Sequence, residues 1–130
     1  MAVDVHVVTP EREVWSGTAD MVVARGVEGE VGILAGHAPL LIRLAIGALR
    51  ILHESSQDVA VVDGGFLHVT SGGEGTRVDV LASHAEMAHE IDLRAVEFRR
   101  EEIERRLAEH DDAEARAELA KALARINIHG

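Results

Sequence analysis

The sequence predicts a β-sandwich N-terminal domain followed by a C-terminal antiparallel α-helical hairpin. Three observations lead to this prediction. Residues 1–86 are rich in Val and Gly and contain short apolar runs separated by turn residues. Residues 87–130 contain a single Gly, at the last position, and are dominated by Ala, Glu, Arg and Leu. At this boundary the spacing of the apolar positions also changes from that of a strand to that of a helix.

Short strands are expected throughout residues 1–86. Val3, Val5 and Val7 alternate with polar residues, which is typical of a half-buried strand, and Pro10 ends it. The apolar run at residues 59–62 predicts a strand that ends at Asp63-Gly64-Gly65. Short strands at this spacing are typical of a sandwich or barrel. The other expected strands cover residues 21–24, 31–34, 49–53, 66–69 and 78–82.

Two helices are expected in residues 87–130. The helical pattern is interrupted at His110-Asp111-Asp112, and Asp112 is a good N-cap, so the two helices form an αα-hairpin. The apolar face of this hairpin is narrow and rich in Ala, so its burial contributes on the order of a few kcal/mol. Such marginal docking is what a movable element requires. The positions expected to share the inner stripes are Val96, Arg99, Ile103 and Leu107, with Phe98 beside them, and Ala115, Leu119, Ala120, Leu123 and Ile126.

The composition argues against several classes of function. The formal net charge of −10 disfavours a nucleic-acid partner, because phosphates require a basic surface. The chain has no Cys, which excludes disulfides and thiolate chemistry. No apolar run approaches the ~20 residues of a membrane-spanning helix, so we expect no direct membrane insertion. Met1 leads straight into a strand pattern without a signal peptide, so we expect it to begin a mature protein made in the cytosol.

No catalytic site and no metal site are expected. The histidines show no ligand spacing, and the two nearest, His84 and His89, do not share a helix face. The serines lack a nucleophile elbow. The glycines at 26, 29 and 32, and at 72, 73 and 75, are interpreted as turn residues rather than as a phosphate-binding loop. The histidines are His6, His37, His53, His68, His84, His89, His110 and His129.

Two basic doublets, Arg99-Arg100 and Arg105-Arg106, occur in the first expected helix of this acidic chain. They predict a positive patch that meets an acidic partner. The alternative is ordinary pairing along the helix surface, of Glu101 with Arg105 and of Glu102 with Arg106.

One segment goes beyond the prediction of a fold class. Residues 28–41, EGEVGILAGHAPLL, closely resemble the EGE-x-GI-x-PGHAPLL signature of the epsilon subunit of bacterial rotary ATP synthases. Residues 7–17, 63–69, 80–86 and 118–125 also resemble that family, in the same order, so the resemblance spans nearly the whole chain. The family's architecture is a β-sandwich with a C-terminal helical hairpin, in agreement with the periodicity.

The resemblance implies a subunit of the central stalk that binds the gamma subunit and touches the ring of c subunits. It would help couple proton flow to ATP synthesis at the cytoplasmic face of the bacterial cell membrane. In many members the hairpin extends toward the alpha and beta subunits and restrains ATP hydrolysis, and the two arginine doublets suit an acidic segment of beta. By position, Glu30 and His37 match family residues at the c-ring contact. Ala35 replaces the usual Pro there, which implies a looser loop. The chain itself would be a non-catalytic regulatory subunit.

The resemblance also raises the question of a regulatory ATP site. Some relatives bind ATP through an I/L-D-x-x-R-A motif, whereas residues 91–95 read IDLRA, with one residue between Asp92 and Arg94 instead of two. Residues i and i+2 of a helix point to nearly opposite sides, so we expect weak or no ATP binding and no cofactor. Two alternatives stay open: Asp92 is an N-cap outside the helix, or Glu90 takes its place. The other contacts that the resemblance implies, Glu86 and Arg125, are present.

The competing interpretation is a free-standing β-sandwich module that binds a ligand or peptide and dimerises through its hairpin. Aromatic residues make up only 2% of the chain, and grooves for sugars and peptides generally use them, so this interpretation is disfavoured.

Overall fold

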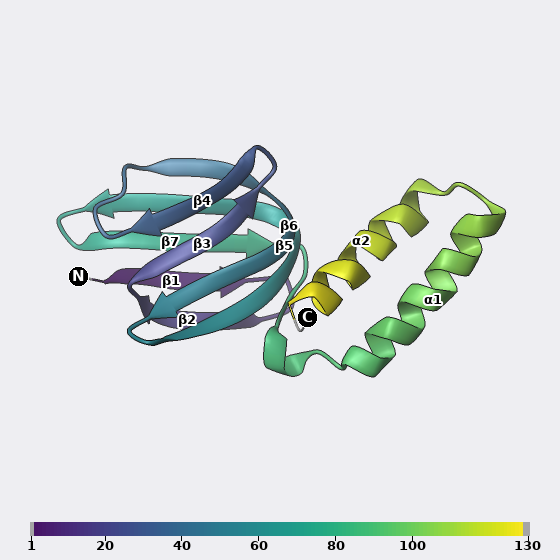
Figure 1. Cartoon of the computed structure of the whole chain (residues 1–130). Helices are drawn as coiled ribbons and strands as arrows, with labels where there is room; N and C mark the ends of the chain where they lie inside the picture. The colour runs from purple at the N-terminus through teal and green to yellow at the C-terminus, as the bar shows by residue number, and fades with distance from the viewer. Residues whose placement is uncertain (1, 129–130) are drawn as a thin grey trace.

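The computed structural model describes residues 2–128 (Figure 1). Strands precede helices along the chain, as the sequence predicts. In chain order the elements are β1 (Val3–Val8), β2 (Glu13–Ala19), β3 (Met21–Gly26), β4 (Gly29–Leu34), β5 (Leu40–His53), β6 (Ser56–Gly72), β7 (Gly75–Ala82), β8 (Ala85–Met87), a 3₁₀ turn (Ala88–Glu90), α1 (Leu93–Glu109) and α2 (Ala113–Asn127).

The strands form one hydrogen-bonded sheet that folds over on itself. Their order is β2-β1-β7-β6-β5-β3-β4, with β8 paired to β6. β1 and β7 run parallel, and the other neighbours are antiparallel. β5 and β6 are long enough to belong to both layers: one part of β6 pairs with β7 and the other with β8, while the second part of β5 pairs with β3. The predicted β-sandwich is therefore confirmed.

Two adjacent glycines let β6 bend from one layer into the other. Gly64 and Gly65 have φ values of 92° and 122°, which favour glycine. A Cβ on Gly65 would overlap the backbone carbonyl of Leu81 on the neighbouring strand. The predicted strand end at residues 63–65 is therefore wrong, because these glycines produce a bend within one strand instead of a turn between two.

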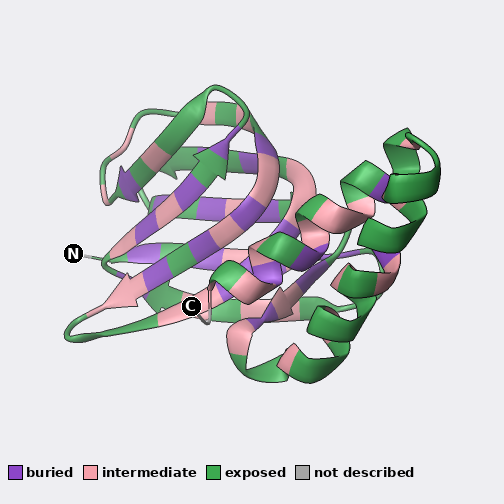
Figure 2. Cartoon of the chain, turned by 45° about the vertical axis from the view of Figure 1, so that its right-hand side comes forward, coloured by how far each residue is buried: buried purple, intermediate pink, exposed green. Residues whose placement is uncertain are grey.

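The core lies between the two layers. Val3, Val5 and Val7 are fully buried, which confirms the period-two pattern of β1. Figure 2 shows the same alternation of buried and exposed residues along most strands, while both helices are largely exposed. Met87 and Ala85 of β8 also belong to this core. β8 therefore crosses the expected domain boundary between residues 86 and 87. The division into two domains stays a prediction.

The hairpin lies beside the sandwich, which α2 contacts through β5 and β6 (Figure 1). The predicted N-cap is confirmed, since Asp112 accepts a hydrogen bond from the Glu114 amide at 2.9 Å. The helix stripes differ from the prediction: Ala120, Leu123 and Phe98 are exposed. α2 is rotated so that Ala122 and a charged residue, Arg125, face inward in their place. The buried side chains of the two helices are Ile103, Ala115, Ala122 and Arg125.

Candidate functional site at the hairpin–sandwich junction

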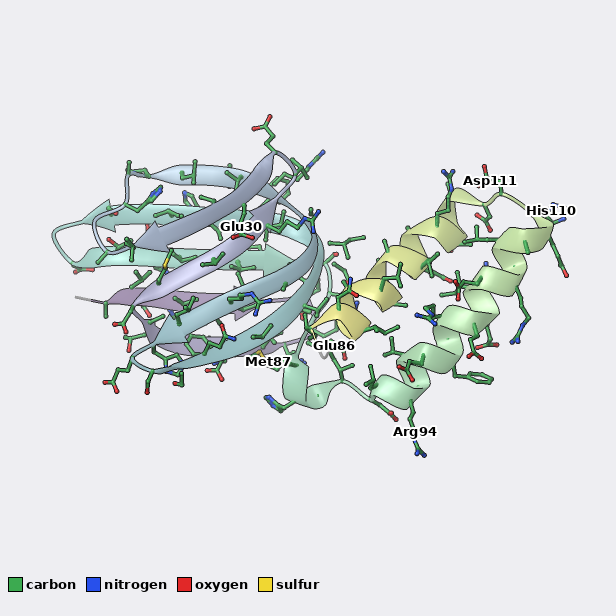
Figure 3. All side chains as sticks on the ribbon, viewed as in Figure 1. Glu30, Glu86, Met87, Arg94, His110 and Asp111 are labelled. Carbon is green, nitrogen blue, oxygen red and sulfur yellow. The ribbon has the colours of Figure 1, made fainter. Side chains whose placement is uncertain are left out.

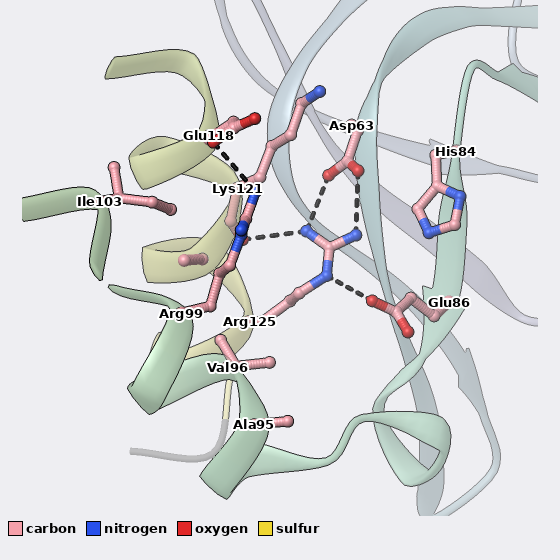
Figure 4. Close-up of a pocket in the computed structure, with 11 residues that line it drawn as sticks. Asp63, His84, Glu86, Ala95, Val96, Arg99, Ile103, Glu118, Lys121 and Arg125 are labelled. Atoms are coloured by element: carbon pink, nitrogen blue, oxygen red, sulfur yellow. Dashed lines mark hydrogen bonds and ion pairs between the residues drawn. The ribbon is translucent and has the colours of Figure 1, made fainter. Parts of the chain in front are cut away.

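α2 places Arg125 against two carboxylates of the sandwich. Nη1 and Nη2 of Arg125 donate to the two carboxylate oxygens of Asp63, on β6, at 2.8 and 2.9 Å. Nε donates to Glu86 on β8 (Figure 4). Nη1 also donates to the carbonyl of Lys121, one turn earlier in α2, at 2.9 Å. The planar guanidinium fork suits this bidentate contact, which Lys cannot form. We call Asp63, Glu86 and Arg125 the junction cluster.

Two members of the junction cluster are shielded from water. The side chains of Arg125 and Asp63 are only 8% and 5% exposed. Burial on its own would lower the pKa of Arg125, but the hydrogen bonds and negative charges of Asp63 and Glu86 outweigh it and raise the pKa above its ordinary value. The guanidinium therefore stays charged, and its charge is compensated by the sandwich.

A pocket of about 350 Å³ opens beside the junction cluster, between the two helices and the sandwich (Figure 4). Its lining includes acidic Glu118 and basic Arg99 and Lys121, together with His84. The three carboxylates and the three Lys and Arg side chains of this lining balance in charge. An anionic ligand would therefore compete with carboxylates that already occupy Arg125.

The structure brings together two of the four residues considered for ATP binding. Glu86 and Arg125 are in contact, whereas Arg94 is exposed and points away from the sandwich (Figure 3). Asp92 is the N-cap of α1 and accepts from the Ala95 amide at 3.3 Å, so the first alternative for Asp92 is confirmed. The second alternative is that Glu90 replaces Asp92. Glu90 is paired with Arg12 and does not line the pocket.

Glu30 and His37 lie at different ends of β4. Glu30 is exposed near the start of the strand (Figure 3). It lines a hollow together with Val27 and Arg43. His37 follows the end of the strand, and its carbonyl accepts from Ser71 at 2.6 Å. The neighbouring Gly36 amide donates to Thr76 at 2.7 Å. The loop after β4 is therefore held against the β6–β7 hairpin, although Ala35 stands where a Pro was expected.

Three of the four arginines in the two doublets are paired with glutamates of the hairpin. Arg99 and Arg106 both donate to Glu118 on α2, at 3.2 and 3.3 Å. Arg100 pairs with Glu104 along α1 at 3.3 Å. The alternative pairs, of Glu101 with Arg105 and of Glu102 with Arg106, are absent from the described part of the chain. Arg106 turns across the hairpin to α2 instead.

The sequence alone does not mark Asp63 and Glu118 as functional residues. Asp63 follows an apolar run and precedes two glycines, which is the ordinary pattern of a turn. Its partner, Arg125, lies 62 residues away. One signal for the cluster is present in the sequence: Arg125 is a charged residue at a position that shares the helical spacing of Ala115 and Ala122.

The outer face of the sandwich carries apolar side chains. Phe66 of β6 pairs in register with Leu81 of β7 and Arg43 of β5, and these residues share one face of the sheet with Leu41. Leu41, Phe66 and Leu81 are 65%, 44% and 53% exposed. The Arg43 guanidinium lies 5.9 Å from the centre of the Phe66 ring, within cation–π range. We call Leu41, Arg43, Phe66 and Leu81 the outer patch.

No group of three or more His, Asp or Glu in residues 2–128 is arranged to hold a metal ion. His129, one of the eight histidines considered, lies outside the described residues. Neither helix of this part of the chain has the length and apolar character needed to cross a membrane.

Comparison with known proteins identifies the family. The family model of the ATP synthase, Delta/Epsilon chain, beta-sandwich domain matches residues 2–88. The ATP synthase epsilon chain of Thermobifida fusca is 46% identical over 125 residues, which cover 94% of this chain and 88% of the relative. The epsilon chain of Acidithiobacillus ferridurans is 42% identical over 130 residues, covering 97% and 89%.

A solved structure resembles this chain over nearly its full length. A chain in the cryo-EM structure of the Euglena gracilis mitochondrial ATP synthase, OSCP/F1/c-ring in rotational state 1, superposes with a TM-score of 0.77 at 26% identity, covering 98% of this chain and 80% of that chain. The sandwich, the hairpin and the sequence relatives therefore agree, and this chain belongs to the ATP synthase epsilon chain family.

Proposed function

We propose that this chain is a non-catalytic subunit of the central stalk of a rotary, proton-translocating ATP synthase. It binds the gamma subunit and the c-ring and helps couple proton flow to ATP synthesis at the cytoplasmic face of the bacterial cell membrane. It restrains ATP hydrolysis when its hairpin extends toward the alpha and beta subunits. The epsilon chain relatives and the F1/c-ring assembly that contains the similar structure support this role.

The observation that carries the proposal is the outer patch. Phe66 and Leu81 are large apolar side chains that the folded chain leaves in contact with water, on adjacent strands. Exposed apolar groups gathered on one face mark an interaction surface. Arg43 lies against the Phe66 ring, and aromatic residues and Arg are the types that dominate binding energy at protein interfaces. The outer patch therefore fits a stalk partner.

A pull-down from detergent-solubilised membranes tests the proposal. The tagged full chain is compared with a Phe66→Gln/Leu81→Gln variant and with a control, Phe98→Gln, which changes an exposed apolar residue on α1. The wild type and the control should recover gamma and c subunits, and the double variant should lose most of both. Recovery of the wild type only as a soluble homodimer would support the free-standing binding module instead.

We also propose that the free chain binds ATP weakly or not at all. Arg125 is already bound by Asp63 and Glu86, and Arg94 does not line the junction pocket. Isothermal titration of the full chain with ATP, with and without magnesium, tests this directly. Little or no heat is expected. Saturable micromolar binding that disappears on Arg94→Ala would contradict the proposal.

A further inference from the structure

The hairpin contacts the sandwich through small apolar side chains and through one buried charged residue. Its buried apolar residues are Ile103, Ala115 and Ala122, and none of them belongs to the hydrophobic core of the sandwich. Two of these three are alanines, which bury little surface. Arg125, in contrast, reaches into the sandwich and is almost fully buried. Arg125 is therefore the charged contact that defines where α2 meets the sandwich.

The junction cluster specifies one position of α2 without making that position very stable. Desolvation of a buried ion pair offsets most of its attraction, so the net stabilisation is small while the geometry is strict. A shift of α2 by one residue would leave Asp63 buried without a cation. When α2 leaves the sandwich as a whole, water solvates the guanidinium and both carboxylates. Docking is thus specific and readily reversible.

Arg125 is also oriented by its own helix. The bond from Nη1 to the carbonyl of Lys121 lies within α2 and does not require the sandwich. It orients the guanidinium fork before α2 docks on Asp63 and Glu86, which reduces the conformational entropy lost on docking. The other charged groups that line the junction pocket are Arg99 of α1 and Glu118 and Lys121 of α2, with His84 on the sandwich side. None of the hydrogen bonds found in the described residues joins these four to Asp63 or Glu86 through their side chains.

We propose that Asp63, Glu86 and Arg125 form an ionic latch that holds α2 on the sandwich, and that opening this latch frees the hairpin. The regulatory meaning of a freed hairpin rests on the proposed function. The latch itself is a property of the isolated chain, so it is tested without the synthase. A failure of the latch and a failure of the stalk assignment are therefore distinguishable.

Native-state hydrogen exchange of the full chain tests the latch. A helix of 15 residues is marginal in water without tertiary contacts, so the protection of α2 amides reports its docking. Arg125→Gln and Asp63→Asn should each increase exchange in α2 at least tenfold while β5 and β7 keep their protection. The double variant should exchange no faster than the faster single variant, because both changes remove the same bond. The control is Arg116→Gln, an exposed arginine of α2 that pairs with Asp111 at 3.1 Å, and it should change nothing.

Two results would overturn the latch. Unchanged α2 protection in both single variants would mean that apolar packing holds the helix. Loss of protection in the strands together with α2 would mean that Arg125 supports the whole fold instead of the docking of one helix. Arg125→Lys separates charge from geometry. If the latch is correct, the exchange rate of α2 amides in this variant should lie between those of the wild type and Arg125→Gln, because an ammonium group cannot bind Asp63 and Glu86 in the same fork.

Discussion

Arg12 and Glu90 form a bidentate ion pair across 78 residues of chain. Nη1 and Nη2 of Arg12 donate to the two oxygens of Glu90 at 2.8 and 2.9 Å. The Met87 amide donates to the same carboxylate at 2.8 Å. The pair thus connects the loop between β1 and β2 to the segment from which the hairpin departs. It fixes the start of the hairpin, while the junction cluster fixes its end.

This pair predicts a defined pH dependence. Hydrogen bonds from Arg12, and then from the Met87 amide, lower the pKa of Glu90 from 4.5 to about 2. A lowered pKa in the folded state gives stability that is fully present above pH 4.5 and is lost as the pH falls toward 2. Glu90→Gln should therefore reduce the free energy of unfolding by about 0.5–1 kcal/mol at neutral pH, because the pair is partly exposed.

Urea unfolding at about pH 7, 4.5 and 3 measures this difference. The gap between wild type and Glu90→Gln should narrow as the pH falls below the ordinary pKa of a carboxylate. Glu11→Gln, which changes an exposed carboxylate of the same loop, serves as control. A gap of equal size at all three pH values would show that the ionised carboxylate contributes nothing.

Gly65 is expected to tolerate no side chain. Gly65→Ala would place a Cβ against the backbone of Leu81 at a φ of 122°, so it should destabilise the fold by at least about 2 kcal/mol. Gly73→Ala is the matched control, because its Cβ would meet no atom within 4 Å, and it should change stability by less than about 0.5 kcal/mol. Thermal unfolding followed by circular dichroism compares the two, and equal losses would contradict the bend in β6.

Glu118 is expected to hold the two helices of the hairpin together. It accepts hydrogen bonds from Arg99 and Arg106, so Glu118→Gln should weaken the hairpin by up to about 1 kcal/mol. Glu104→Gln removes only the pair with Arg100 along α1 and should have a smaller effect. Hydrogen exchange of α1 amides reports the difference, and equal effects would show that Glu118 has no special role between the helices.

The four arginines of α1 are expected to contribute to the restraint of ATP hydrolysis. In the folded hairpin Glu118 binds Arg99 and Arg106, so separation of the helices would release both for an acidic partner. Replacement of all four by Ala should raise ATP hydrolysis by the assembled complex, whereas Arg116→Ala should not. An unchanged rate of ATP hydrolysis, with the variant still incorporated in the complex, would favour a purely structural role for the four arginines. The replaced residues are Arg99, Arg100, Arg105 and Arg106.

Local patterns predicted much of this fold. The alternation of Val3, Val5 and Val7 is set by the strand's own geometry, and the Asp112 N-cap is set by the helix that follows it. Such features depend on neighbours in the sequence. The bend at Gly64-Gly65 shows the limit of this reasoning, because two glycines permit a turn and a bent strand equally. The choice between them depends on Leu81, on another strand.

The candidate site depends on contacts that no local pattern contains. Glu86 and Arg125 could be named because a family resemblance pointed to their positions. Asp63 could not, because its role exists only once β6 and α2 lie side by side. The same is true of Glu118, which is half-buried in the structure but lies in a sequence with the composition of an ordinary solvated helix. The tertiary fold determines which charged residues pair over long distances in the chain. The sequence shows the charged residues but not which of them pair.

We propose that the hairpin regulates a rotary ATP synthase through its position. The most direct measurement compares ATP hydrolysis by the assembled complex containing the full chain with that of the complex containing a chain without residues 88–130. The shortened chain keeps the whole of β8, whose buried Met87 belongs to the sandwich core. Faster hydrolysis is expected with the shortened chain at equal incorporation. Equal hydrolysis rates with both chains fully incorporated would contradict it.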